Sequence, residues 1–235
     1  MGKLNYNDDI PYLENQLFSR WKEQRNYEYF VKDGVFNPQI WKKQKIKITF
    51  VLKEANWMNE NVDMKEWILS ESSATYWKTW NNVSRWTKGI LEGGEYPVHV
   101  SKKDKTDWLS RISFINLKKV GGNSKANNKE IRQYAIRDAK YLLEQLTIYC
   151  PDIIICCGRG TGKNADLLYE EILDKNTLSQ WQIPINGFNY FYTHFPGKEN
   201  RTPVISFYHP QRIASHATFE KWYEDICFIA EKLMC

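Results

Sequence analysis

The sequence predicts an α/β protein of three layers, in which helices cover both faces of a central, mostly parallel sheet of four strands. Short apolar runs recur along the chain, and segments with helical spacing of apolar residues lie between them. This alternation is typical of parallel strands joined by crossover helices. Because 235 residues suffice for one well-buried core, we predict a single domain over residues 1–235 with a helical extension over about residues 1–40.

The first half of the chain predicts a helix, a strand, a helical region and a second strand. Residues 11–31 place apolar side chains at helical intervals, with a proline near the first turn. Residues 46–52, IKITFVL, are apolar enough for a central strand, and residues 63–93 show helical spacing that stops at Gly-Gly. The charged segment 101–107 predicts a loop, and residues 111–117 supply the second strand.

The second half of the chain continues the alternation of strands and helices. Cys150 and Pro151 end the first helix of this half, and the apolar runs that follow are again of strand length. The predicted elements are a long helix over residues 128–149, a strand over 153–157, a helix that follows the turn at 158–163 and runs through 173, a less regular strand over 188–194, a strand over 203–208 and a closing helix over 218–233.

The composition permits a nucleic-acid partner without requiring one. Lysine and arginine exceed aspartate and glutamate by 33 − 28 = 5, and aromatic residues make up 15% of the chain, with 10 Trp and 14 Tyr. Basic side chains bind phosphates, and flat aromatic side chains stack on bases. DNA, double- or single-stranded, is therefore a candidate partner.

The cysteines and the hydropathy pattern argue against several other classes. The five cysteines are odd in number and contain no CxxC pair, which argues against a disulfide framework, a zinc site or a four-cysteine cluster. The chain shows no apolar signal-peptide core and no run near the roughly 18 apolar residues of a membrane span. We expect a cytoplasmic monomer that needs neither a metal nor another cofactor.

Three predicted strand ends carry polar residues that could share one crevice. Glu54, Asn116 and His209 each lie at or just after the end of a predicted parallel strand, and such ends meet at one edge of the sheet. A carboxylate can stabilise the cation-like sugar formed when a glycosidic bond breaks, or orient water toward it. An imidazole N–H can stabilise the departing base, and an amide can read a base edge. The three groups together suit cleavage of an N-glycosidic bond.

The order of these pieces resembles the uracil-DNA glycosylase superfamily. The matching segments are FVLKEANW (50–57), SFINLKK (113–119), PDIIICCG (151–158) and VISFYHPQRI (204–213). The resemblance covers about residues 46 to 215 and implies a uracil-DNA glycosylase-like fold. It also implies a DNA glycosylase that flips a base out of the stack and hydrolyses its bond to the sugar, leaving an abasic site.

The resemblance assigns roles by position. Glu54 matches the acidic residue of the first motif, and Ala55 stands where other branches place a water-activating aspartate. Asn116 matches the base-reading asparagine, and His209 matches the histidine that contacts the base carbonyl. The base pocket would also include Asn56 and Trp57, and the apolar wedge that enters the stack would be Ile213.

Departures from the family pattern indicate an unusual base. Lys53 and Asn56 replace the usual Gly and Pro, and Gln211 replaces the usual Ser after His-Pro. The pattern is closer to divergent branches, including antiphage glycosylases that remove bulky modified bases such as glucosylated hydroxymethylcytosine from viral DNA. A repair glycosylase for uracil or another deaminated base is the alternative substrate class. No lysine is assigned as a Schiff-base nucleophile, so strand cleavage by the protein itself is not expected.

Several residues beside the crevice are candidate DNA contacts. Basic side chains bind phosphates, and backbone N–H groups of a glycine-rich turn can do the same. The candidates are Lys118, Lys119, Gly160, Lys163 and Arg212.

Other readings of these residues remain open. Glu54 could cap a helix or pair with a lysine, Asn116 could form a turn, and His209 could be structural. Segment 158–164, GRGTGKN, follows a strand as a phosphate-binding loop does, but it is one residue short and lacks the magnesium-binding Ser or Thr. An NTPase and a catalytically silent nucleic-acid binder are therefore the alternatives from other classes.

Overall fold

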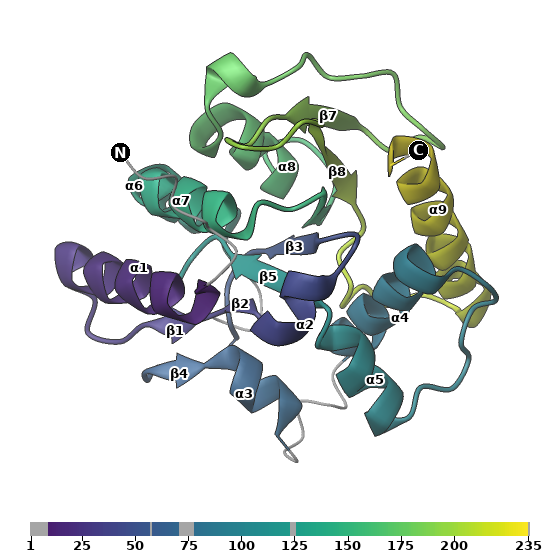
Figure 1. Ribbon diagram of the computed structural model, residues 1–235, viewed down its shortest axis with the longest axis horizontal. Coiled ribbons are helices and arrows are strands. Elements are labelled where there is room, and N and C mark those ends of the chain that lie inside the picture. The colour runs from purple at the N-terminus through teal and green to yellow at the C-terminus, as the bar shows by residue number, and fades with distance from the viewer. Residues whose placement is uncertain (1–8, 57, 71–77, 123–125, 235) are drawn as a thin grey trace.

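The computed structural model describes residues 9–56, 58–70, 78–122 and 126–234. A six-stranded mixed sheet crosses the molecule in the order β2-β5-β3-β6-β8-β7 (Figure 1). Its central strands β5, β3, β6 and β8 are parallel, and the edge strands β2 and β7 are antiparallel to their neighbours. The bounds are β2 Gly34–Val35, β3 Ile48–Leu52, β5 Ile112–Asn116, β6 Ile153–Cys157, β7 Tyr190–Thr193 and β8 Thr202–Phe207.

The α/β class is confirmed, but the predicted count of four strands is too small. The four parallel strands are those that the apolar runs predicted, because all of their residues are buried. Strand β7 lies within residues 188–194, which were predicted as a less regular strand. Strand β2 has only two residues, too few for a hydropathy pattern. A separate pair of two-residue strands, β1 (Val31–Lys32) and β4 (Val62–Asp63), was also missed.

The described helices lie on both sides of the sheet. Helices α1, α6, α7 and α8 lie on the left and upper side of Figure 1, and α4, α5 and α9 lie on the right. The bounds are α1 Ile10–Arg25, α2 Pro38–Lys43, α3 Met64–Leu69, α4 Lys78–Glu92, α5 Lys102–Leu109, α6 Asn128–Arg137, α7 Ala139–Tyr149, α8 Asn164–Leu167 and α9 His216–Met234. A π-helical turn, Leu168–Ile172, extends α8, and Lys175–Thr177 form a 3₁₀ turn.

Alternating strand residues supply two hydrophobic cores. Val51, Ile154 and Val204 pack in the core that includes α1 and α7, whereas Phe50 and Ile155 face the core that includes α4 and α9. Successive side chains of a strand point to opposite faces, so a run without polar residues predicts a strand covered on both sides. The central sheet is therefore packed on both faces, and the loops at its carboxyl edge start from buried strands.

Two local predictions need correction. The segment predicted as a charged loop contains α5, because Ser101 and Asp104 form a capping box in which each side chain accepts the other residue's backbone N–H. The single long helix predicted over residues 128–149 is two helices, broken at Asp138. The Asp138 carboxylate is buried and accepts hydrogen bonds from Arg25 at 2.8 Å and Tyr27 at 2.6 Å, which ties the break to α1.

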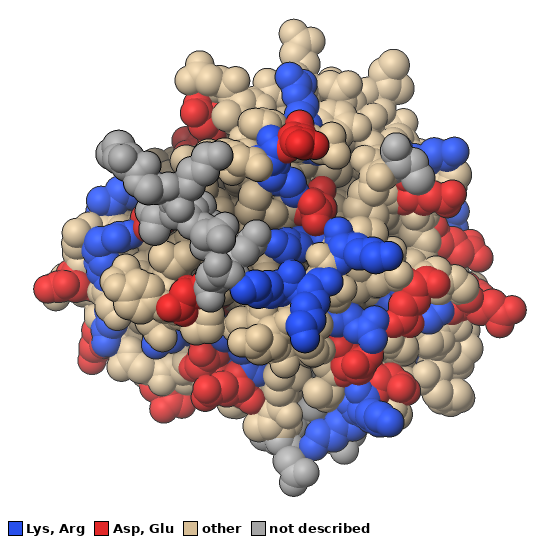
Figure 2. All heavy atoms as spheres, in the orientation of Figure 1, with Lys and Arg blue, Asp and Glu red and all other residues tan. Residues whose placement is uncertain are grey.

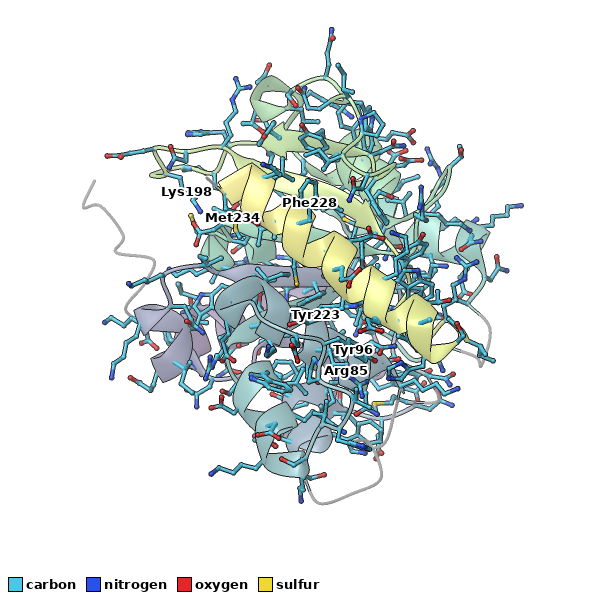
Figure 3. The ribbon with its side chains drawn as sticks, turned by 90° about the vertical axis from the view of Figure 1, so that its right-hand side faces the viewer. Arg85, Tyr96, Lys198, Tyr223, Phe228 and Met234 are labelled. Carbon is cyan, nitrogen blue, oxygen red and sulfur yellow. The ribbon has the colours of Figure 1, made fainter. Side chains whose placement is uncertain are left out.

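Helix α9 closes the chain by packing along α4 (Figure 3). Tyr223 of α9 points toward Tyr96, with ring centroids 5.5 Å apart, and the Arg85 guanidinium lies 5.2 Å from the Tyr96 ring. Arg85 also donates to the carbonyl oxygens of Pro97 and Val98, both at 2.9 Å. The segment after α4 is thus fixed between the two helices. No helix in the described part of the chain has the length and apolar character needed to cross a membrane.

Candidate active site

The loops that follow β3, β5 and β8 surround a cavity of about 700 Å³ at the carboxyl edge of the sheet. Glu54, Asn116 and His209, which lie far apart in the sequence, all line it. The other described lining residues are Leu52, Lys53, Ala55, Asn56, Met64, Lys78, Thr79, Trp80, Ala126, Asn128 and Gln211. The structure therefore brings together the three residues that the strand ends predicted.

Glu54 is held in place on two sides. Its Oε2 accepts a hydrogen bond from Lys118 Nζ at 2.8 Å, and only 6% of its side chain is exposed. On the other side it packs against Gly122, where an added Cβ would lie 2.0 Å from the Glu54 carboxyl carbon. Gly122 N–H donates to Ala55 O at 2.8 Å, so the loop after β5 is bound to the loop after β3. A side chain at position 122 would therefore displace the Glu54 carboxylate.

Lys118 is not the surface residue that the sequence suggested. Its side chain is 4% exposed, and its ammonium binds Glu54 at 2.8 Å and Glu130 at 2.7 Å and lies 5.2 Å from the Tyr134 ring. Burial alone would lower the pKa of Lys118, but the hydrogen bonds and charges of Glu130 and Glu54 raise it above its usual value. Lys118 is therefore a fixed cation that orients Glu54, and the predicted DNA contact needs correction.

Lys119 also lies inside the protein. Its side chain is 0% exposed, and Nζ contacts both carboxylate oxygens of Asp33, at 2.7 and 2.6 Å. A buried ammonium paired in this way cannot reach a phosphate, so the predicted DNA contact is wrong. Asp33 also accepts the backbone N–H of Asn116 at 2.6 Å and the amide of Gln145 at 2.8 Å. The pair thus anchors the end of β5.

Asn116 ends β5 with its side chain at the cavity. It is 2% exposed, and its Nδ2 donates to the thioether sulfur of Met64 at 3.6 Å. Sulfur is a weak acceptor, so this contact orients the amide without saturating it. The backbone of Asn116 is fixed by Asp33, and the amide remains available to a polar ligand in the cavity.

His209 follows β8, and its surroundings determine its protonation. The backbone N–H of Gln211 donates to Nδ1 at 3.2 Å, so the ring proton of a neutral imidazole lies on Nε2. Burial and, to a smaller extent, the charge of Lys53 together lower the pKa of His209 to about 4. At neutral pH His209 is a neutral hydrogen-bond donor through Nε2.

A titration should reveal this state directly. Because its pKa is depressed to about 4, the His209 imidazole should remain the neutral Nε2–H form from pH 8 to pH 5.5, whereas an ordinary histidine titrates near 6.5. The unfolded chain binds this proton as the pH falls through about 6.5, whereas the folded protein binds it only near pH 4. His209 therefore lowers the stability of the fold progressively as the pH falls from about 6.5 to about 4. Two-dimensional ¹H–¹⁵N NMR of the imidazoles checks this.

The chain has four histidines, and a His209→Gln variant assigns the signal. Charging of the His209 ring near pH 6.5 would contradict the depressed pKa. A proton on Nδ1 of the neutral ring would contradict the hydrogen bond from Gln211.

The other residues predicted for the base pocket divide into three cases. Ala55 is buried beneath the cavity, and Asn56 lines it and forms a parallel bridge with Gly122. Trp57 lies outside the described residues.

The glycine-rich turn after β6 uses its polar groups internally. Asn164, buried at the start of α8, donates its side-chain amide to Val51 O at 3.0 Å and Cys157 O at 2.9 Å. Gly162 N–H donates to the Asp166 carboxylate at 2.6 Å. Asn164 thus joins the ends of β3 and β6 and is not a stand-in for the magnesium ligand of an NTPase loop. Gly160 is exposed and Lys163 half-buried beside this turn.

Arg212 and Ile213 lie on the exposed loop between β8 and α9. The Arg212 guanidinium lies 5.6 Å from the Tyr208 ring and 5.8 Å from the Trp222 ring, and these two rings stack with centroids 4.3 Å apart. Ile213 is 83% exposed. A large apolar side chain so exposed, four residues from His209 in the chain, is available to a partner.

The sequence did not single out several lining residues. Lys53 and Gln211 were noted only as departures from the family pattern, and Asn128 was noted only as the start of a helix. Asn128 accepts a hydrogen bond from Lys53 Nζ at 2.9 Å. Spacing along the chain gave no signal for this pair, since 75 residues separate its members.

A second basic region lies away from the cavity. Figure 2 shows basic side chains gathered near the middle of the face where α2 lies in Figure 1. Lys42 and Lys43 in the last turn of α2 and Lys45 after it are exposed. This segment leads into the start of β3, at the opposite edge of the sheet from the cavity. Among the described residues, no group of three or more His, Cys, Asp or Glu side chains could hold a metal ion.

Comparisons with known proteins add no assignment. No protein-family model matches the chain, and the search of curated proteins found no match.

Proposed function

We propose that the protein is a DNA glycosylase that hydrolyses the N-glycosidic bond of a flipped, modified base and leaves an abasic site. The observation that carries the proposal is that Glu54, Asn116 and His209 line one cavity at the carboxyl edge of a parallel sheet. Ligands of open α/β sheets bind at such edges. The resemblance of the four strand-end motifs to the uracil-DNA glycosylase superfamily supports the same reading.

The proposed reaction begins with the target nucleotide flipped into the cavity, at a cost of a few kcal/mol. The exposed Ile213 enters the stack in place of the base, and Arg212 and Lys163 hold phosphates at the mouth. As the bond to the base lengthens, the sugar becomes cation-like, and the Glu54 carboxylate stabilises it and orients water toward C1′. Lys118 Nζ, 2.8 Å from that carboxylate, holds it in position.

The departing base carries the negative charge in this mechanism. His209 Nε2–H donates a hydrogen bond to a base oxygen on which the charge accumulates, and Asn116 reads the base edge. A neutral imidazole suits this role because its single N–H, on Nε2, can donate to the base oxygen while Nδ1 accepts the Gln211 N–H. Its depressed pKa keeps it neutral throughout the physiological range.

The size and polarity of the cavity favour a bulky substrate. A volume of about 700 Å³ is far larger than an unmodified pyrimidine needs and lies within the range of sites for drug-sized ligands. Besides the three central residues, the lining offers polar groups on Lys53, Thr79 and Asn128. These groups can bind the hydroxyls of a sugar attached to the base, so glucosylated hydroxymethylcytosine of phage DNA is the proposed class.

A panel of DNAs tests the proposal. Duplex and single-stranded oligonucleotides carrying glucosylated hydroxymethylcytosine, hydroxymethylcytosine, uracil or an unmodified base are incubated with the protein and then cleaved with alkali to reveal abasic sites. We expect abasic sites from the glucosylated base and far fewer from the others. Release of uracil alone would support a repair glycosylase, and release of none, with DNA binding intact, would support a silent binder.

A further inference from the structure

Lys53 is a lysine of the cavity that takes no part in the bond cleavage of the proposed hydrolysis. It is the first residue after β3, and it lines the cavity together with Glu54 and His209. Its side chain and the His209 ring both border Gly158, where an added Cβ would lie 4.0 Å from Lys53 Cε and 3.9 Å from His209 Cδ2. Lys53 Nζ donates to the neutral Asn128 Oδ1 at 2.9 Å, and no described carboxylate lies within ion-pair distance of it.

Two lysines approach Glu54, and their environments differ. Lys118 is bound by two carboxylates, which raise its pKa and keep it an ammonium. Burial lowers the pKa of Lys53, and the nearby charge of Lys163 lowers it further, against a smaller opposing effect of Glu54. A lysine that is partly desolvated and lies beside another cation has the environment that activates an amine as a nucleophile toward carbonyl groups.

We propose that Lys53 forms an imine with the aldehyde of an abasic site, which gives the protein a second activity, cleavage of the DNA strand on the 3′ side of that site. The inference rests on the proposed function, because base release in the same cavity would supply the aldehyde. It goes beyond hydrolysis by water and reverses the expectation from the sequence, which assigned no Schiff-base lysine, since the attacking group on C1′ is the lysine amine.

The atoms balance without an oxidant or a reductant. The Lys53 amine adds to C1′ of the ring-opened sugar, and the carbonyl oxygen leaves as water, which gives an iminium ion. A base removes a C2′ proton, the electrons of that bond form a C2′–C3′ double bond, and the 3′ phosphate leaves with the C3′–O electrons. Water then hydrolyses the iminium and restores the amine.

The geometry points to Glu54 as the base in this elimination. Its carboxylate is adjacent to Lys53 in the chain and lines the same cavity. His209 is unsuited, because Nδ1 already accepts the Gln211 N–H and Nε2 carries the proton. The lysine and the carboxylate can thus act in turn on neighbouring sugar atoms.

Borohydride trapping tests the inference. Duplex DNA with a preformed abasic site is incubated with the protein and sodium borohydride, which reduces an imine to a stable secondary amine. We expect a covalent protein–DNA complex with the wild type and with Lys78→Arg, the matched change at another lysine of the cavity, and its loss with Lys53→Arg, which keeps the charge but not the nucleophile. Peptide mass spectrometry should place the adduct on Lys53.

The outcomes separate this inference from the proposed glycosylase. Absence of a trapped complex with the wild type, or an undiminished complex with Lys53→Arg, would overturn the role of Lys53. Binding of each variant to DNA with a non-reactive tetrahydrofuran site shows whether the variant still folds and binds. If Lys53→Arg does not bind, peptide mass spectrometry of the wild-type adduct decides whether Lys53 is the attached residue. Alkali-dependent abasic sites without trapping would leave a glycosylase that lacks this activity. Trapping without release of any base would contradict the proposed glycosylase activity and leave the proposed imine formation by Lys53 standing.

Discussion

Replacing Glu54 by glutamine is expected to slow base release by roughly 10²- to 10⁴-fold, the usual contribution of a positioned carboxylate to such chemistry. Glutamine has nearly the same shape, so the contact with Gly122 and a hydrogen bond from Lys118 can persist. What is lost is the negative charge that stabilises the cation-like sugar. The rate of abasic-site formation under single-turnover conditions, on whichever DNA of the panel is the substrate, measures the effect.

Glu130→Gln is the matched control for this prediction. Glu130 binds the same ammonium of Lys118 at 2.7 Å, but its side chain is 39% exposed and is not among the lining residues of the cavity. We expect Glu130→Gln to slow base release far less than Glu54→Gln does. Equal losses would mean that the charge balance around Lys118 matters and that Glu54 has no direct part in the reaction.

The parallel core of the sheet could be predicted because each of its strands is buried on both faces. Burial on both faces leaves an uninterrupted apolar run, and the end of the run marks the residue that enters the loop. For this reason Glu54, Asn116 and His209 could be assigned to one edge of the sheet before any geometry was known. The two-residue strands could not be found in this way, since a pattern of alternation needs more residues than they have.

The partners of the buried charges could not be predicted. Lys118 and Lys119 follow a strand in a way typical of exposed basic residues, and nothing in their spacing indicates that both ammonium groups turn inward. Their partners Glu54 and Asp33 lie 64 and 86 residues away in the chain. Such pairs are set by tertiary packing, which one sequence does not reveal.

Asp33→Ala is expected to destabilise the protein by about 3–5 kcal/mol, because it leaves the buried Lys119 ammonium without its partner. The same change removes the acceptor of the Asn116 backbone N–H and of the Gln145 amide. A loss of this size is a large fraction of the stability of a typical domain, roughly 5–15 kcal/mol. The free energy of unfolding, from urea denaturation followed by fluorescence, measures it.

A double-mutant cycle separates the charge pair from the other contacts of Asp33. With Lys119→Met in the background, Asp33→Ala no longer strands a buried cation, so its additional cost should fall well below its cost in the wild type. The cost that remains reports the lost acceptor for Asn116 and Gln145. An unchanged cost in both backgrounds would mean that the Asp33–Lys119 pair, although fully buried, contributes no coupling, and that Asp33 acts only as the acceptor for Asn116 and Gln145.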